Sequence, residues 1–127
     1  MYYQLMITTP QATREAAALE TMFGLARGML TRLLVGFPPG AVALAHVQIR
    51  YHGWQLCPWN LGGSLAWDNY VYDMALAYDL VEEPYELIIR TWNDDDSYAH
   101  TVFVGAEVTE GEPGAEAVLQ QYPLGKG

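Results

Sequence analysis

The chain of 127 residues has one cysteine, Cys57, and therefore no second thiol for an internal disulfide. This excludes the disulfide-stabilised secreted domains, and a reducing cytoplasmic setting is expected. Pro58 follows Cys57 directly, and no nucleophile elbow or glycine-rich oxyanion turn surrounds the pair. Cys57 is thus predicted to be a buried thiol and not a catalytic nucleophile.

Basic residues are also scarce, because 6 Lys and Arg stand against 15 Asp and Glu and leave a formal charge of −9. Such a charge repels phosphate backbones and anionic membrane surfaces, so direct binding of nucleic acid or membrane is disfavoured. Two interpretations of the charge stay open. It steers the protein towards a basic partner, or it only keeps the protein soluble.

Long apolar runs are missing as well, and a leader is not expected from the first residues. The longest stretches without formal charge, 33–49 and 51–67, contain Pro, Gly, His, Gln or Asn, and the first residues lack a basic region. Neither a membrane span nor a secretory signal is predicted. Hydrophobic residues nevertheless make up 51% of the chain, enough for one core, so we expect a single domain over residues 1–127.

Apolar residues at helical spacing predict two helices. The first follows the cap Thr9-Pro10, carries a stripe of apolar residues from Leu19 to Leu33, and ends before residues 36–40. The second begins at Ser64 and ends before Pro84. Its predicted apolar stripe consists of Trp67, Val71, Met74, Ala75 and Tyr78.

Four segments have the composition of strands, namely 2–8, 41–52, 85–92 and 98–108. The last two are expected to form an antiparallel hairpin across the polar turn 93–97, and 54–63 is either a loop or a short edge strand. A poorly ordered tail is expected from about residue 110, with one helical turn over 115–121. The predicted fold class is α+β, a mainly antiparallel sheet with two helices packed on one face.

About a third of the chain resembles the gyrase-inhibitor-like effector-binding family. The similar parts are Pro84-Tyr85-Glu86-Leu87, the segment VFVGAEV at 102–108, and YPLGK at 122–126. The resemblance implies two strand–helix–strand–strand units and a pocket for lipophilic cations, with Glu86 as the buried acid and Trp67, Tyr85 and Trp92 as its lining. This chain ends where the family continues into a further strand and helix.

Metal and cofactor motifs are absent from the sequence. There is no HxH, HExxH or CxxC spacing, so His46, His52 and His100 are expected to be structural histidines. Asp94 would open a calcium loop only if the twelfth position were a glutamate, and that position is Gly105. We expect no metal, no cofactor and no catalytic residues.

Aromatic residues and carboxylates are concentrated together between residues 54 and 92. Such a mixture forms either a contact surface for a cationic partner or an aromatic core beneath a solvated acidic face. The first alternative predicts a non-enzymatic acidic protein that docks on a basic, nucleic-acid-binding site of a partner protein, as inhibitors, immunity proteins and phage counter-defence proteins do. The predicted contact residues are Asp68, Asp73, Asp79, Glu82, Glu83, Asp94, Asp95, Asp96, Trp54 and Trp59; the oligomeric state is left open.

Overall fold

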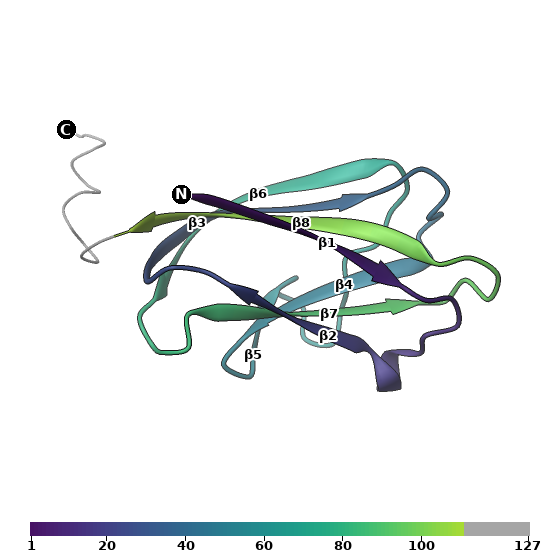
Figure 1. The fold of residues 1–127 in the computed structure, drawn as a ribbon, viewed down its shortest axis with the longest axis horizontal. Coiled ribbons are helices and arrows are strands. Elements are labelled where there is room, and N and C mark those ends of the chain that lie inside the picture. Colours follow the sequence, from purple (N-terminus) through teal and green to yellow (C-terminus); the bar gives the residue numbers. More distant parts are fainter. Residues whose placement is uncertain (111–127) are drawn as a thin grey trace.

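The structure is a computed structural model that describes residues 1–110, and it is built from β-strands in two packed layers (Figure 1). A single 3₁₀ turn, η1 (Glu15–Ala17), is the only helical element in that range. The strands are β1 (Tyr2–Thr9), β2 (Leu19–Gly24), β3 (Gly28–Phe37), β4 (Ala45–Tyr51), β5 (Trp54–Cys57), β6 (Tyr70–Leu80), β7 (Glu86–Asn93) and β8 (His100–Glu110).

The strand order identifies the architecture as a jelly roll. The first sheet has the order β1-β8-β3-β6 and the second β2-β7-β4-β5, with every neighbouring pair antiparallel. Two interlocked Greek keys on two facing sheets define this fold, which hosts capsid domains, lectins and enzymes. The fold therefore assigns no activity by itself.

The predicted α+β class is wrong, and the first predicted helix is replaced by β2 and β3. β3 is buried or half-buried at nine of its ten positions, so its apolar residues run almost without interruption and fit a helical period as well as any other. Gly24 ends β2 and Gly28 begins β3, so these two glycines bound the connection between the strands.

The second predicted helix is replaced by a long connection and β6. From Val71 to Leu80 the side chains of β6 alternate between exposed positions and half-buried or buried ones, which is the period of a strand. The apolar residues Tyr72, Met74, Leu76 and Tyr78 all face inwards. The helical stripe predicted from Trp67 to Tyr78 combined residues from both faces of this strand.

The four predicted strands are confirmed as β1, β4, β7 and β8. Of the two alternatives for 54–63, a loop or a short edge strand, the structure has a short edge strand, β5, followed by a loop. The predicted β7–β8 hairpin is wrong because the two strands lie in different sheets. Their connection crosses from one layer to the other, so β7 pairs with β2 and β4, whereas β8 pairs with β1 and β3.

The core lies between the inner faces of the two sheets. Val35 and Val104 of the first sheet, and Ile49 and Leu87 of the second, have no solvent exposure.

The strand–helix–strand–strand units implied by the family resemblance do not occur within residues 1–110. No helix in the same range is long and apolar enough to cross a membrane. The predicted tail lies outside the described residues.

Candidate functional site

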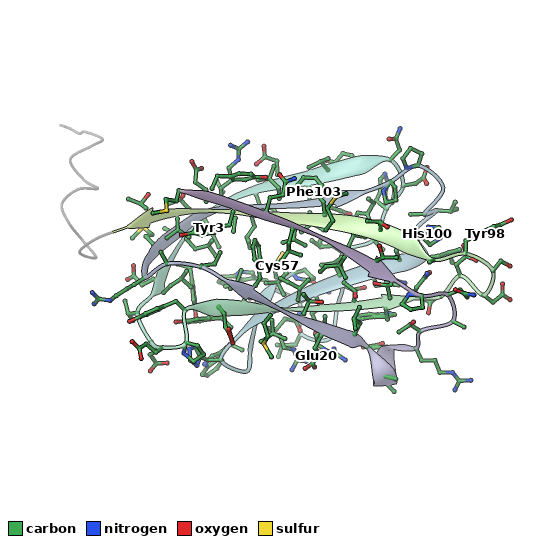
Figure 2. The ribbon with its side chains drawn as sticks, in the orientation of Figure 1. Tyr3, Glu20, Cys57, Tyr98, His100 and Phe103 are labelled. Carbon is green, nitrogen blue, oxygen red and sulfur yellow. The ribbon has the colours of Figure 1, made fainter. Side chains whose placement is uncertain are left out.

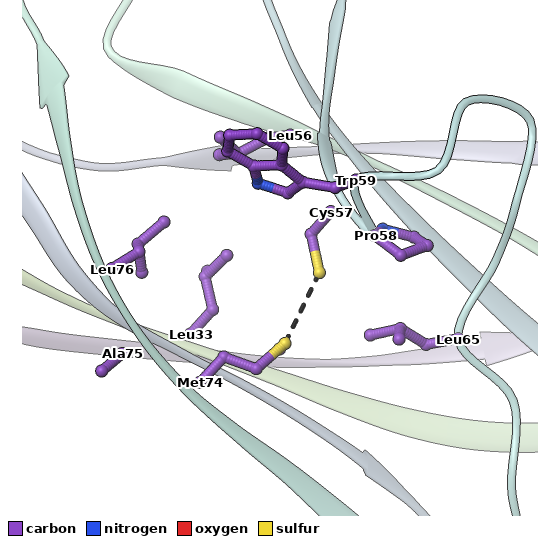
Figure 3. A pocket seen from close by; sticks show the side chains of 9 residues that line it. All are labelled: Leu33, Leu56, Cys57, Pro58, Trp59, Leu65, Met74, Ala75 and Leu76. Atoms are coloured by element: carbon purple, nitrogen blue, oxygen red, sulfur yellow. Dashed lines mark hydrogen bonds between the residues drawn. The ribbon is translucent and has the colours of Figure 1, made fainter.

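An apolar pocket opens where β5 and β6 end their respective sheets. The two strands face each other across the sandwich and are not hydrogen-bonded to one another. The pocket between them has a volume of about 300 Å³ (Figure 3). Its lining is Leu33, Leu56, Cys57, Pro58, Trp59, Leu65, Met74, Ala75 and Leu76, which come from β3, β5, β6 and the β5–β6 connection.

Cys57 carries the one titratable group in the pocket wall. Its Sγ lies 3.6 Å from the Sδ of Met74, to which it donates a hydrogen bond, and it stands between the two layers (Figures 2 and 3). Burial raises the pKa of the Cys57 thiol to about 11, because the surroundings disfavour the thiolate. The prediction of a buried thiol is confirmed, and a protonated thiol is a poor nucleophile.

Two large apolar side chains stand exposed on the first half of the connection that follows β5, and a third, Trp67, is exposed near its end. Trp59, whose residue is 89% exposed, contributes to the pocket wall, and Leu61 is 85% exposed. At the other end of β5, Trp54 is 71% exposed. Exposed apolar groups beside a pocket, as Trp59 is here, are typical of a surface that another molecule covers.

The first half of this connection is fixed by the side chain of Gln55. Its Nε2 donates to the carbonyl oxygens of Pro58 at 2.6 Å and Asn60 at 2.9 Å, and its Oε1 accepts from the backbone N–H of Gly62 at 2.9 Å. The N–H of Gly63 donates to the carbonyl of Asn60 at 2.9 Å. Trp59 and Leu61 are thus held outwards by a turn with its own hydrogen-bond network.

The second half of the connection is fixed by β4. Gln48 donates to the carbonyl of Gly63 at 2.9 Å, and Leu65 exchanges two backbone hydrogen bonds with Val47 at 2.8 and 2.9 Å. His46 Nδ1 lies 2.9 Å from Ser64 Oγ. The connection is therefore tied to β4 by both side-chain and backbone bonds.

His46 also joins this connection to the β7–β8 loop. Its Nε2 lies 2.9 Å from an Asp94 oxygen, and its ring stacks on Trp92 at 5.2 Å between centroids. The hydrogen-bonded series Ser64–His46–Asp94 has the residue types of a nucleophile, base and acid, but its acid is about half exposed. In hydrolytic triads the acid is buried. The contacts of His46 connect the β5–β6 connection and the β7–β8 loop to β4.

Five predicted contact residues gather on β6 and its flanks. Asp73 and Asp79 point outwards from the strand, Asp68 precedes it, and Glu82 and Glu83 follow it. All five are exposed. Between Tyr51 and Ile89 the sequence contains no Lys or Arg, so any such cation beside these carboxylates comes from another segment.

Two of these five carboxylates have partners within the protein. Arg32 donates to Asp73 through Nε at 2.8 Å and a second nitrogen at 2.7 Å, and this bond lowers the pKa of the Asp73 carboxyl. Asp68 accepts from the N–H groups of Gly40 and Val42 at 2.8 and 2.9 Å. Within residues 1–110, Asp79, Glu82 and Glu83 form no ion pair.

The other predicted acidic group, Asp94 to Asp96, lies in the β7–β8 loop and not beside the pocket. Asp95 accepts from the backbone N–H of Ser97 at 2.9 Å and lies 2.8 Å from His100 Nε2, and these bonds lower the pKa of its carboxyl. Figure 2 shows His100 at this end of the sandwich. Trp54 and Trp59, in contrast, lie on or next to β5.

The four residues of the cation-pocket hypothesis are not brought together. Glu86 and Trp92 are six residues apart on β7, roughly 20 Å along a strand. Trp92 is buried against His46, whereas Trp67 is exposed on the connection before β6. Glu86 lines a separate hollow of about 110 Å³ with His52 and Pro84, and Tyr85 is not among its lining residues.

Sequence reasoning missed most of the pocket lining, including Leu56, Leu65 and Leu76. The available signal was the alternation of apolar residues along 70–80, which marks a strand with one inward face.

Among residues 1–110, no group of three or more His, Cys, Asp or Glu side chains is arranged to hold a metal ion. No family model matches the chain, and no curated protein matches it.

Proposed function

We propose that this protein is a non-enzymatic binding protein that docks on a basic surface of a partner protein through its β5–β6 edge. The observation that carries the proposal is the apolar pocket with Trp59 exposed in its wall. Leu61 is exposed two residues further along the same hydrogen-bonded connection. A connection held in one conformation loses little entropy on binding, so its exposed apolar groups contribute more of their burial energy to affinity.

The acidic flank indicates the chemistry of the partner. Asp79, Glu82 and Glu83 are exposed on β6 and just after it, and the stretch 51–89 contributes no compensating cation. Such a surface attracts a basic partner and speeds its approach, most strongly at low salt. A protein that covers a basic, nucleic-acid-binding site in this way acts as an antagonist of that site.

A pair of variants tests the apolar part of the surface. Purified protein is used to capture partners from a lysate of the organism that encodes it. The double variant Trp59→Ser, Leu61→Ser should lose at least about 30-fold in affinity for the captured protein, as expected when a central tryptophan anchor is removed. Tyr98→Ser is the matched control, because Tyr98 is an aromatic residue 71% exposed on the β7–β8 loop.

Charge reversal tests the acidic part. The triple variant Asp79→Lys, Glu82→Lys, Glu83→Lys should abolish capture at low salt, whereas Asp96→Lys on the β7–β8 loop should leave it unchanged. Capture that survives both the charge reversal and the Trp59 and Leu61 substitutions would contradict the proposal. Circular dichroism of each variant confirms that the sandwich is intact.

A further inference from the structure

The free edge of β6 is the least protected part of the candidate site. β6 pairs with β3 from Tyr70 to Leu80 and ends the order of its sheet. Among residues 1–110, no backbone hydrogen bond connects β6 to any other segment. Eleven residues of strand thus present unpaired N–H and C=O groups along one edge, which is a template for pairing with another strand.

The usual protections of an edge strand are weak here. β6 contains no proline, lysine or glycine, and its charged residues are Asp73 and Asp79. One protection is present, a β-bulge between Ala75 and Tyr78, where the register against β3 shifts. Asp73 is occupied by Arg32 from the neighbouring β3. The other edge strand at this side, β5, has four residues and is followed directly by Pro58. β6 is therefore a long edge strand with few of these protections, and β5 beside it is short. An edge of this kind is suited to receiving a strand from another chain.

The pocket adds side-chain recognition to this edge. β6 contributes Met74, Ala75 and Leu76 to the pocket lining, and its inward residues Tyr72 and Tyr78 are half-buried. The edge strand of the facing sheet, β5, has four residues against eleven in β6. A strand added beside β6 lies about 4.8 Å away and points alternate side chains to the same inner side. One of these side chains fits the pocket, since a cavity of about 150 Å³ already holds benzene.

The opposite face of such a strand would meet carboxylates. Asp79 points outwards from β6, and Glu82 and Glu83 stand at its end. A second copy of this chain would bring another charge of −9 and place its own acidic β6 against this one, which is electrostatically unfavourable. A segment with basic residues at the outward positions is complementary.

We propose that β6 accepts a strand from the partner protein, namely an extended segment of alternating apolar and basic residues, with one apolar side chain inserted into the pocket beside Trp59 and Cys57. This inference rests on the proposed function and specifies how the partner is bound. Main-chain hydrogen bonds to β6 would supply affinity, and the pocket and the carboxylates would supply specificity.

The test uses the full chain and the peptide acetyl-Lys-Val-Lys-Leu-Lys-Val-Lys-amide. NMR should show saturable changes at the amides of β6, and alkylation of Cys57 should slow by at least about 10-fold at saturation because the pocket is filled. Asp79→Lys should weaken binding of the peptide, whereas Asp96→Lys should not. A peptide that causes neither the amide changes nor the protection of Cys57 overturns the inference.

Two N-methylated peptides separate strand addition from docking of side chains alone. One carries N-methyl groups on its lysines, and the other carries them on its valines and leucine. Because successive N–H groups of a strand point to opposite edges, each peptide loses the N–H donors of one edge. Strand addition requires one of them to bind at least about 10-fold more weakly than the other. Equal binding of both overturns the inference but leaves the proposed function standing, because that function is tested separately by the Trp59 and Leu61 variants.

Self-association is checked in the same samples. Sedimentation equilibrium should show no dimer of the kind that dissociates when the peptide is added. A dimer whose formation protects the β6 amides would identify a second copy as the occupant and overturn the choice of a basic partner strand.

Discussion

The β7–β8 loop and the β5–β6 edge both place carboxylates near exposed aromatic side chains, but they differ in what those carboxylates bind. In the loop, Asp95 accepts from the N–H groups of Ser97 and Tyr98 and contacts His100, while Asp94 contacts His46. At the edge, Asp79, Glu82 and Glu83 are exposed and outside the ion pairs of residues 1–110.

The difference separates carboxylates that shape the protein from carboxylates that remain available to another molecule. An acid that accepts several hydrogen bonds from its own loop stabilises that loop and has fewer free lone pairs for a partner. Composition alone does not make this distinction, because both groups are clusters of acids in the sequence. Substitutions should therefore change stability in the loop and binding at the edge.

The largest effect on stability is expected for Asn93→Ala, at the start of the loop. Asn93 is fully buried, donates to the carbonyls of Thr9 at 3.2 Å and Tyr98 at 3.0 Å, and accepts from the N–H of Asp95 at 3.0 Å. Alanine leaves these three groups without a partner, so the free energy of unfolding in urea should fall by about 3 kcal/mol. A loss below about 1 kcal/mol would show that water replaces the side chain. Asp96→Ala is the exposed control.

A slightly smaller effect is expected in the alkylation rate of Cys57 at the β5–β6 edge. Its pKa is raised from 9.0 to about 11, so below pH 9 the thiolate fraction, and with it the alkylation rate, should be about 100-fold lower than for a free thiol. The rate should keep rising up to about pH 11, because the thiol loses its proton only there. Iodoacetamide kinetics between pH 7 and 11 measure this. A midpoint near pH 9 would mean that the pocket is filled with water and the β5–β6 edge is open.

The sequence was sufficient for the strands with clear alternation or clear boundaries. Residues 41–52 alternate between apolar and polar side chains, and β4 occupies the middle of that range. Residues 85–92 and 98–108 are rich in β-branched and aromatic residues and became β7 and β8. Their assignment to different sheets could not be predicted, because a turn within one layer and a crossing between layers both use polar residues such as those at 93–97.

The helices were predicted wrongly because two apolar periods fit the same residues. In β6, Tyr72, Met74, Leu76, Tyr78 and Leu80 have the period of a strand. Val71 and Ala75 on the outer face are also apolar, and with Met74 and Tyr78 they form most of the predicted helical stripe. The same ambiguity hid the pocket, since its lining combines β3, β5 and β6 in an arrangement set by the jelly roll. The concentration of acidic residues between 68 and 83 does not depend on the secondary structure, and the five predicted acids of this stretch are exposed. Their part in docking stays a prediction.

The smallest effect on stability is expected for the double variant Glu82→Gln, Glu83→Gln at the end of β6. Both side chains are exposed, and their carboxylates form no ion pair within residues 1–110, so the free energy of unfolding should change by less than about 0.5 kcal/mol. Urea unfolding measures this change, and capture of the partner is measured with the same variant.

Capture should weaken in the same variant, and the loss should shrink as salt is added, because the attraction it removes is screened. Loss of binding without loss of stability is the result that distinguishes an available carboxylate from a structural one. If stability falls by more than about 1 kcal/mol instead, these glutamates stabilise the β6–β7 connection, and the contrast with Asp95 disappears. If neither quantity changes, the acidic flank takes no part in docking, and recognition rests on the pocket with Trp59 and Leu61.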